Sequence, residues 1–152
     1  MRATSEEKRV KDFMTIRNYI IAGLFLSLAS CEDNTEAPLI PNVIVNEQLN
    51  LTNIQYNRLR QDNGYVYLNA GVRGIIVIRE NANRYRAIER NCPYKPEDAC
   101  GIVEVDASNL FLKDPCCGSQ FDLSGQVTGG PATYPLRQYG TTLQGNFLYI
   151  TN

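Results

Sequence analysis

Short hydrophobic segments separated by Gly-, Asn- and Pro-rich turns fill the chain from Asn42 to Asn152. They are rich in Val, Ile, Tyr and Phe, which favour extended, half-buried backbone. The predicted strands are Asn42–Val45, Gln48–Leu51, Gly64–Asn69, Gly74–Arg79, Tyr85–Glu89, Leu110–Leu112, Gln126–Thr128, Leu136–Tyr139 and Phe147–Thr151. Only Tyr56–Arg60 suggests a helical turn. The pattern predicts an all-β domain of antiparallel strands.

A different pattern precedes this domain. Tyr19–Ser30 is an apolar run that follows Arg17 and is too short to cross a bilayer core of about 30 Å as a helix. Its end, Leu28-Ala29-Ser30-Cys31, resembles the lipobox of bacterial lipoproteins. We therefore expect residues 1–30 to be a signal peptide and the Cys31 thiol to carry a diacylglycerol. A buried helix with an incidental cysteine is the alternative.

The charged leader Met1–Phe13 does not suit a signal peptide, whereas a start at Met14 gives one of usual shape. Residues 31–41 are polar and acidic, as in a flexible tether. Acidic residues after the lipidated cysteine also resemble the surface-export signal of Bacteroidota lipoproteins, although a solvated linker explains them equally well. We expect a lipid-anchored protein in the envelope of a Gram-negative bacterium, at the outer membrane and facing the periplasm or the outside.

Composition excludes several classes of function. The formal net charge is −1 and no basic cluster occurs, so no nucleic-acid partner is expected. The chain contains no histidine, which excludes Ser-His-Asp and Cys-His catalysis and every histidine-containing metal site. No other nucleophile–base set can be named. The sequence therefore predicts a protein that is not an enzyme.

Three segments carry a family resemblance: Asn91-Cys92-Pro93-Tyr94, Gly118-Ser119-Gln120-Phe121-Asp122 and Gly130-Pro131-Ala132. They resemble the cluster-binding region of Rieske iron–sulfur proteins. That family has Cys-x-His in one loop and Cys-x-x-His in a second loop, which runs into Gly-Ser-x-Phe/Tyr-Asp; a Gly-Pro-Ala loop closes over the cluster. The resemblance implies a Rieske-like antiparallel β-sandwich over residues 42–152, with a small two-loop subdomain at about residues 91–135.

The ligand positions of the family are largely changed in this chain. Cys92 matches the first cysteine ligand, Tyr94 stands at the first histidine, Asp114 at the second cysteine and Cys117 at the second histidine. A Rieske cluster needs two thiolates on one iron and two imidazoles on the other. The resemblance therefore implies a degenerate member of the family, for which we predict no metal and no cofactor.

The resemblance also suggests how the cysteines pair. In one branch of the family, an extra cysteine in each loop forms a disulfide, and Cys100 and Cys116 stand at these positions. Cys92 and Cys117 would then face each other at former ligand positions, and we predict a second disulfide between them. Once Cys31 is lipidated, four cysteines remain in an oxidising compartment, and they allow three pairings.

Residues around the ligand positions keep a structural role without iron. Gly118 permits a tight turn, Ser119 can hydrogen-bond loop backbone, and Phe121 can pack beneath the loops. Gly130 and Pro131 belong to the loop that closes over the site in the family. The predicted function is a lipid-anchored binding or structural module, held at the membrane by Cys31, with its loop tip facing an envelope protein.

Two rival functions remain open. Cys92, Cys100, Cys116 and Cys117 could hold zinc or an all-cysteine 2Fe-2S cluster for electron transfer, with Asp114 as an oxygen ligand. Adjacent cysteines, however, rarely converge on one metal. Thiol–disulfide chemistry at Cys92 or Cys117 is the other rival, although the Cys-x-x-Cys pair that usually supports it is absent.

Overall fold

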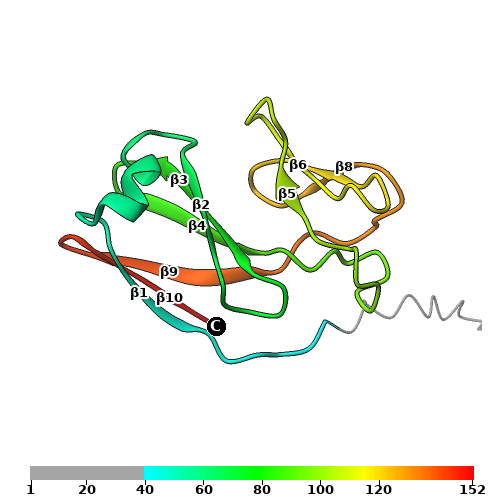
Figure 1. The fold of residues 1–152 in the computed structure, drawn as a ribbon, viewed down its shortest axis with the longest axis horizontal. Coiled ribbons are helices and arrows are strands. Elements are labelled where there is room, and N and C mark those ends of the chain that lie inside the picture. The colour runs from blue at the N-terminus through cyan, green and yellow to red at the C-terminus, as the bar shows by residue number, and fades with distance from the viewer. Residues whose placement is uncertain (1–39) are drawn as a thin grey trace, which may run out of the picture. The chain divides into compact units, whose positions relative to one another are not determined.

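The computed structural model describes residues 40–152 (Figure 1). The predicted signal peptide, the start at Met14, the lipidated Cys31 and most of the predicted tether lie outside the described residues. Within residues 40–152, no helix is long and apolar enough to cross a membrane. All strands of the described part pair antiparallel, and its one helix is a short 3-10 helix, which confirms the predicted fold class.

The strands and the helix η1 follow one another in this order: β1 Asn46–Asn50, η1 Ile54–Arg60, β2 Tyr65–Leu68, β3 Ile75–Asn81, β4 Arg84–Glu89, β5 Glu104–Val105, β6 Leu112–Lys113, β7 Gln120–Phe121, β8 Val127–Gly129, β9 Gln138–Gln144 and β10 Phe147–Thr151. They form a six-stranded sheet in the order β1-β10-β9-β4-β3-β2 and a small sheet in the order β5-β6-β7-β8.

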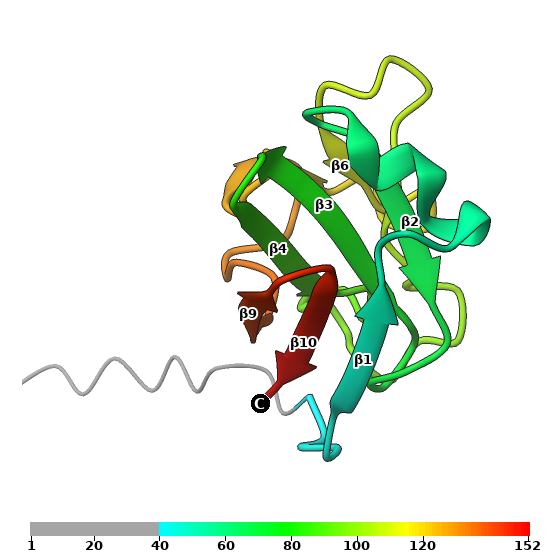
Figure 2. The same ribbon diagram turned by 90° about the vertical axis from the view of Figure 1, so that its left-hand side faces the viewer.

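Strand β9 joins the two halves of the large sheet. Its first residues, Gln138 and Tyr139, pair with β4, whereas Gly140–Gln144 pair with β10. A strand that changes partners in this way lets a sheet curl back on itself. In Figure 2 the large sheet is visibly curled, with β1 and β10 on one side and β2, β3 and β4 on the other. The predicted Rieske-like β-sandwich is thus a single curled sheet.

Strand β3 is buried on both faces and separates two hydrophobic cores. Ile75 and Val77 belong to the core inside the curled sheet, while Ile76 and Ile78 belong to a second core on the outer face. The period of two places successive side chains of a strand on opposite faces. Because the first part of β3 must be apolar on both sides, its first four residues, Ile75 to Ile78, are an unbroken aliphatic run.

The second core lies beneath the loops that carry the family resemblance. It contains Phe121, Leu112, Cys92 and Leu136, which meet Ile88 of β4. The small sheet and its connecting loops form a separate layer to the right of the large sheet in Figure 1. The predicted loop subdomain therefore has a sheet of its own and shares the second core with the outer face of β3 and β4.

Some boundaries differ from the prediction. Asn42–Val45 is not a strand, because the side chain of Asn152 takes the place of a ladder partner: its Oδ1 accepts from the Val45 amide at 3.1 Å and its Nδ2 donates to the Val43 carbonyl at 2.9 Å. Strand β1 begins at Asn46. Strands β5 and β7 were not predicted, since a two-residue strand shows no periodicity.

Candidate functional site

The first loop of the site begins at a buried carboxylate at the end of β4. Glu89 has no exposed surface, and its Oε1 accepts from the Arg73 and Asn91 amides at 2.9 and 3.0 Å. Its Oε2 accepts from the Val72 amide at 2.8 Å and from the Tyr139 hydroxyl at 2.6 Å. Burial, followed by the hydrogen bond to Glu89, raises the pKa of Tyr139. Glu89 thereby ties β4, β9 and the turn before β3 to the start of the loop.

Sequence reasoning missed the role of Glu89. A signal was present, because an acidic residue closes the apolar strand Tyr85–Glu89, where a buried side chain is expected. A charged group in such a place needs several hydrogen-bond partners.

The second loop is built around Asp114, which is 1% exposed. Its Oδ1 accepts from the Cys116 amide at 2.8 Å, and its backbone carbonyl accepts from the Gly118 amide at 2.9 Å. The Asp114 amide in turn donates to the Ser119 carbonyl at 2.9 Å. These bonds close the tight turn that carries Cys117, which donates from its thiol to Asp114 Oδ2 at 3.2 Å.

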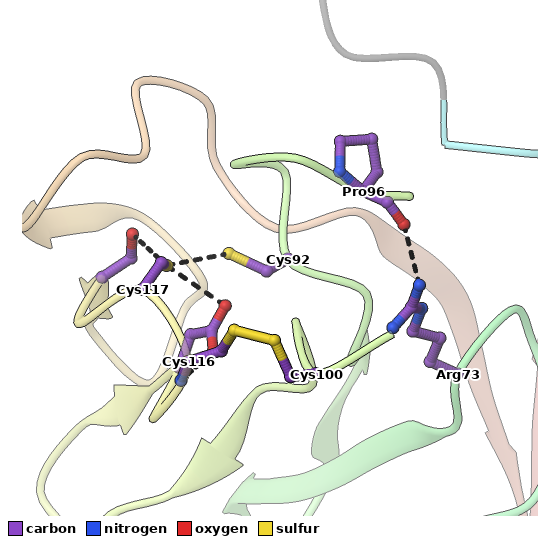
Figure 3. Close-up of a disulfide and its surroundings, with 8 residues drawn as sticks. Arg73, Cys92, Pro96, Cys100, Cys116 and Cys117 are labelled. Carbon is purple, nitrogen blue, oxygen red and sulfur yellow. Dashed lines mark hydrogen bonds between the residues drawn. A yellow bond between two sulfur atoms is a disulfide. The ribbon is translucent and has the colours of Figure 1, made fainter. Parts of the chain in front are cut away.

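Three residues from the two loops converge at one point. The Sγ atoms of Cys92 and Cys117 and a carboxylate oxygen of Asp114 all lie within 4.8 Å of one another. The two sulfur atoms are 3.8 Å apart, and Figure 3 shows their side chains pointing toward each other. Ser119 Oγ lies 3.0 Å from the Cys117 sulfur and accepts from the Ala132 amide at 3.1 Å, which links the Gly-Pro-Ala loop to the site.

A disulfide joins Cys100 to Cys116, as the resemblance predicts (Figure 3). Cys92 and Cys117, by contrast, are separate thiols, so the predicted second disulfide is not present in this structure. The two side chains do face each other, as expected. The two sulfurs are 3.8 Å apart, well beyond the length of about 2.05 Å of a disulfide bond, and the Cys117 thiol hydrogen-bonds to Asp114 instead.

Electrostatics favour the protonated form of Cys92. Burial, followed by the hydrogen bond to Asp114, raises the pKa of this thiol well above its usual range, although the Tyr94 amide acts in the opposite direction. A thiol nucleophile must be ionised to react, and a buried thiol with a raised pKa is inert. The geometry therefore argues against thiol–disulfide exchange at Cys92.

The remaining predicted positions have packing roles. Tyr94 is half-buried and its ring packs against the second core, with the Lys95 ammonium 5.5 Å from the ring centroid. Phe121 is fully buried beneath the loops. Gly130 has φ +85°, and a Cβ there would lie 2.5 Å from Ser119 Cα, so this glycine allows the closing loop to touch the second loop.

These donor groups do not fit a Rieske cluster. Two sulfur atoms and a carboxylate converge, but two imidazoles are required and the chain has none. The four-cysteine alternative also needs correction, since Cys100 and Cys116 are bonded to each other and their sulfurs are not free to bind a metal. Of that set, only Cys92 and Cys117 remain, together with Asp114.

The chain is similar in sequence and in structure to known iron–sulfur proteins. No family model matches the chain. Over 52 residues it is 35% identical to the cytochrome b6-f complex iron-sulfur subunit of Chlorobaculum thiosulfatiphilum; the match covers 34% of this chain and 28% of that relative. Its structure is similar to that of the plasma membrane Rieske protein PetC3 from Synechocystis PCC 6803, with a TM-score of 0.50 and 26% identity, over 59% of this chain and 87% of that one.

Proposed function

This chain carries a Rieske-type domain, and from that premise we propose that it is a lipid-anchored envelope protein that binds another protein through its loop tip and holds no Rieske cluster. The observation that carries the proposal is the role of Asp114 in the second loop. Where the family has a cysteine ligand, Asp114 is buried and caps a turn through Oδ1. The chain has no histidine for the other iron.

The loops are organised by bonds that need no iron. The Cys100–Cys116 disulfide joins the first loop to the second, and Ser119 joins the second loop to the Gly-Pro-Ala loop through Ala132. Closing a loop of this size lowers the entropy of the unfolded chain by an amount worth about 3 kcal/mol. The loop tip can therefore keep one conformation as a purely protein surface.

We define the loop tip as five exposed, uncharged residues from the second loop and the start of the closing loop: Pro115, Cys116, Gly118, Gly130 and Pro131. A disulfide, two prolines and a close glycine contact restrict its motion. A surface that is already rigid loses little entropy when a partner binds, which favours affinity. The sequence has no basic cluster, which favours a protein partner over a polyanion.

The lipid anchor would hold this tip near other envelope components. An extended tether over residues 31–41 would reach about 35 Å from the membrane. The relative from Synechocystis is itself named a plasma membrane protein. We therefore expect the partner to be another protein at the membrane surface.

Photo-crosslinking in the native host tests the binding role. A crosslinking amino acid at Pro131, in the tip, should capture one discrete protein. The matched control at Gln144 lies at the exposed β9–β10 turn, at the opposite end of the domain from β8 in Figure 1, and should capture none. Equal crosslinking from both positions, or none from Pro131, would contradict a binding role for the tip.

Two further measurements test the anchor and the cluster. Cys31→Ser should move the protein from the membrane fraction to the soluble fraction and abolish labelling with fatty acid. Protein isolated from its host should contain no pair of iron atoms and no visible absorbance from an iron–sulfur centre. A bound two-iron centre would overturn the proposal.

A further inference from the structure

The trio of Cys92, Asp114 and Cys117 has the dimensions of a single-ion site. Two sulfur ligands of a tetrahedral zinc ion, each about 2.3 Å from the metal, lie about 3.8 Å apart. The Cys92 and Cys117 sulfurs are 3.8 Å apart without any metal. A sulfur and a carboxylate oxygen on the same ion lie about 3.5 Å apart, and Cys117 Sγ is 3.2 Å from Asp114 Oδ2.

We propose that Cys92, Asp114 and Cys117 bind one zinc ion, with a fourth position left to water. This goes beyond the proposed binding role and does not depend on it. When the ion binds, each thiol releases its proton to the buffer as its sulfur–zinc bond forms, and Asp114 Oδ2 exchanges its hydrogen bond from Cys117 for the metal. No change in oxidation state is involved.

Neighbouring groups already hold the proposed ligands in place. Asp114 Oδ1 is held by the Cys116 amide, so Oδ2 is the oxygen directed at the sulfurs. Ser119 Oγ lies against the Cys117 sulfur at 3.0 Å. Such contacts from outside the ligand set orient metal ligands and stabilise their charge.

Space is also available beside the trio. Gly101 is buried, and a Cβ built on it would lie 3.6 Å from Cys92 Cβ and 3.7 Å from Asp114 Oδ2, at ordinary contact distance. The atom nearest to that Cβ is the Asp98 carbonyl oxygen at 3.4 Å, so the glycine keeps a space of about one methyl group beside Cys92 Cβ and Asp114 Oδ2. Two thiolates and one carboxylate suit zinc better than the harder cations Mg²⁺ or Ca²⁺, which prefer oxygen ligands only.

The test uses the full chain, purified in detergent without oxygen. Zinc content is measured by mass spectrometry, and Co²⁺ is titrated as a coloured substitute for zinc. We expect one zinc per chain and the strong visible bands of tetrahedral, thiolate-bound cobalt. Cys92→Ser and Cys117→Ser should weaken binding at least a hundredfold, and Asp114→Asn about tenfold. The matched control Asp98→Asn, an exposed carboxylate of the first loop, should bind as the parent does.

A measurement on the unaltered protein guards against variants that fail to fold. Zinc should protect Cys117, whose side chain is partly exposed, from alkylation by iodoacetamide, and a chelator should remove that protection. The proposal is overturned if the reduced protein binds neither ion, if binding survives Cys92→Ser, or if the isolated protein carries a Cys92–Cys117 disulfide or a two-iron centre instead.

Discussion

Tyr139 donates its phenolic hydrogen to the buried carboxylate of Glu89 at 2.6 Å, across 50 residues of sequence. The bond joins β9, where the large sheet changes direction, to the end of β4, where the first loop begins. Together with three backbone amides it satisfies a carboxylate that has no exposed surface. The pair connects the curvature of the sheet to the placement of the site.

Glu89→Gln should therefore lower the free energy of unfolding by about 3 kcal/mol, because the new amide group would point a donor at groups that are donors themselves. Tyr139→Phe should lower it by about 2 kcal/mol by removing one donor from a buried charge. Urea denaturation measures both. Tyr149→Phe is the control, since the Tyr149 hydroxyl accepts only an exposed hydrogen bond from Gln48 and its loss should cost under about 0.5 kcal/mol. Equal effects at Tyr139 and Tyr149 would contradict the anchoring role of Glu89.

Gly130→Ala should destabilise the protein by at least about 2 kcal/mol. Its left-handed φ of +85° costs a residue with a Cβ about 1–2 kcal/mol, and the added carbon would press on Ser119 Cα and on the Gly118 carbonyl at 2.7 Å. Gly129→Ala is the matched control, because a Cβ there would meet only Gln120 Oε1, at 3.9 Å. Thermal unfolding of the two variants compares them directly. A harmless Gly130→Ala would mean that the loops do not touch as described.

Reduction of the Cys100–Cys116 disulfide should cost about 3 kcal/mol of stability, given its sequence separation of 16. Both cysteines are exposed, so a mild reductant should reach the bond. The double variant Cys100→Ser/Cys116→Ser should match the reduced parent in urea unfolding. A parent that loses no stability on reduction would show that the hydrogen bonds of Asp114 and Ser119 suffice to hold the loops.

Acid should lower the stability of the folded protein in part by protonating Asp106. The backbone amide of Ser108, then its hydroxyl and the Lys113 ammonium, lower the pKa of Asp106 to about 2 from an ordinary value of 3.8. Because the folded pKa is the lower one, ionised Asp106 stabilises the fold above pH 4, and this contribution is lost as the pH falls toward 2. Asp106→Asn should show a flatter dependence of melting temperature on pH over that window. NMR titration of the Asp106 carboxyl measures the pKa itself, and an ordinary value would refute the account.

Much of the site was predictable because it depends on the identity of residues. The sequence shows the absence of histidine, the cysteines at two former ligand positions, and the Gly-Ser-x-Phe-Asp and Gly-Pro-Ala segments. It also shows the aliphatic first half of strand β3 and the turn glycines, since burial on both faces and positive φ leave a local signature. The strand pattern predicted the all-β class, and the family resemblance supplied the Rieske-like fold and the Cys100–Cys116 pairing.

Other features depend on distances between segments that are far apart in the chain, and these required the folded structure. The sequence places Asp114 beside Cys117 but does not reveal that its carboxylate holds the Cys117 thiol 3.8 Å from Cys92 without a bond between the sulfurs. The Glu89–Tyr139 contact and the change of partners along β9 are likewise non-local. Residue types and their local order limit which chemistry is available, whereas the fold selects which of the available partners meet, because only packing brings their atoms within bonding distance.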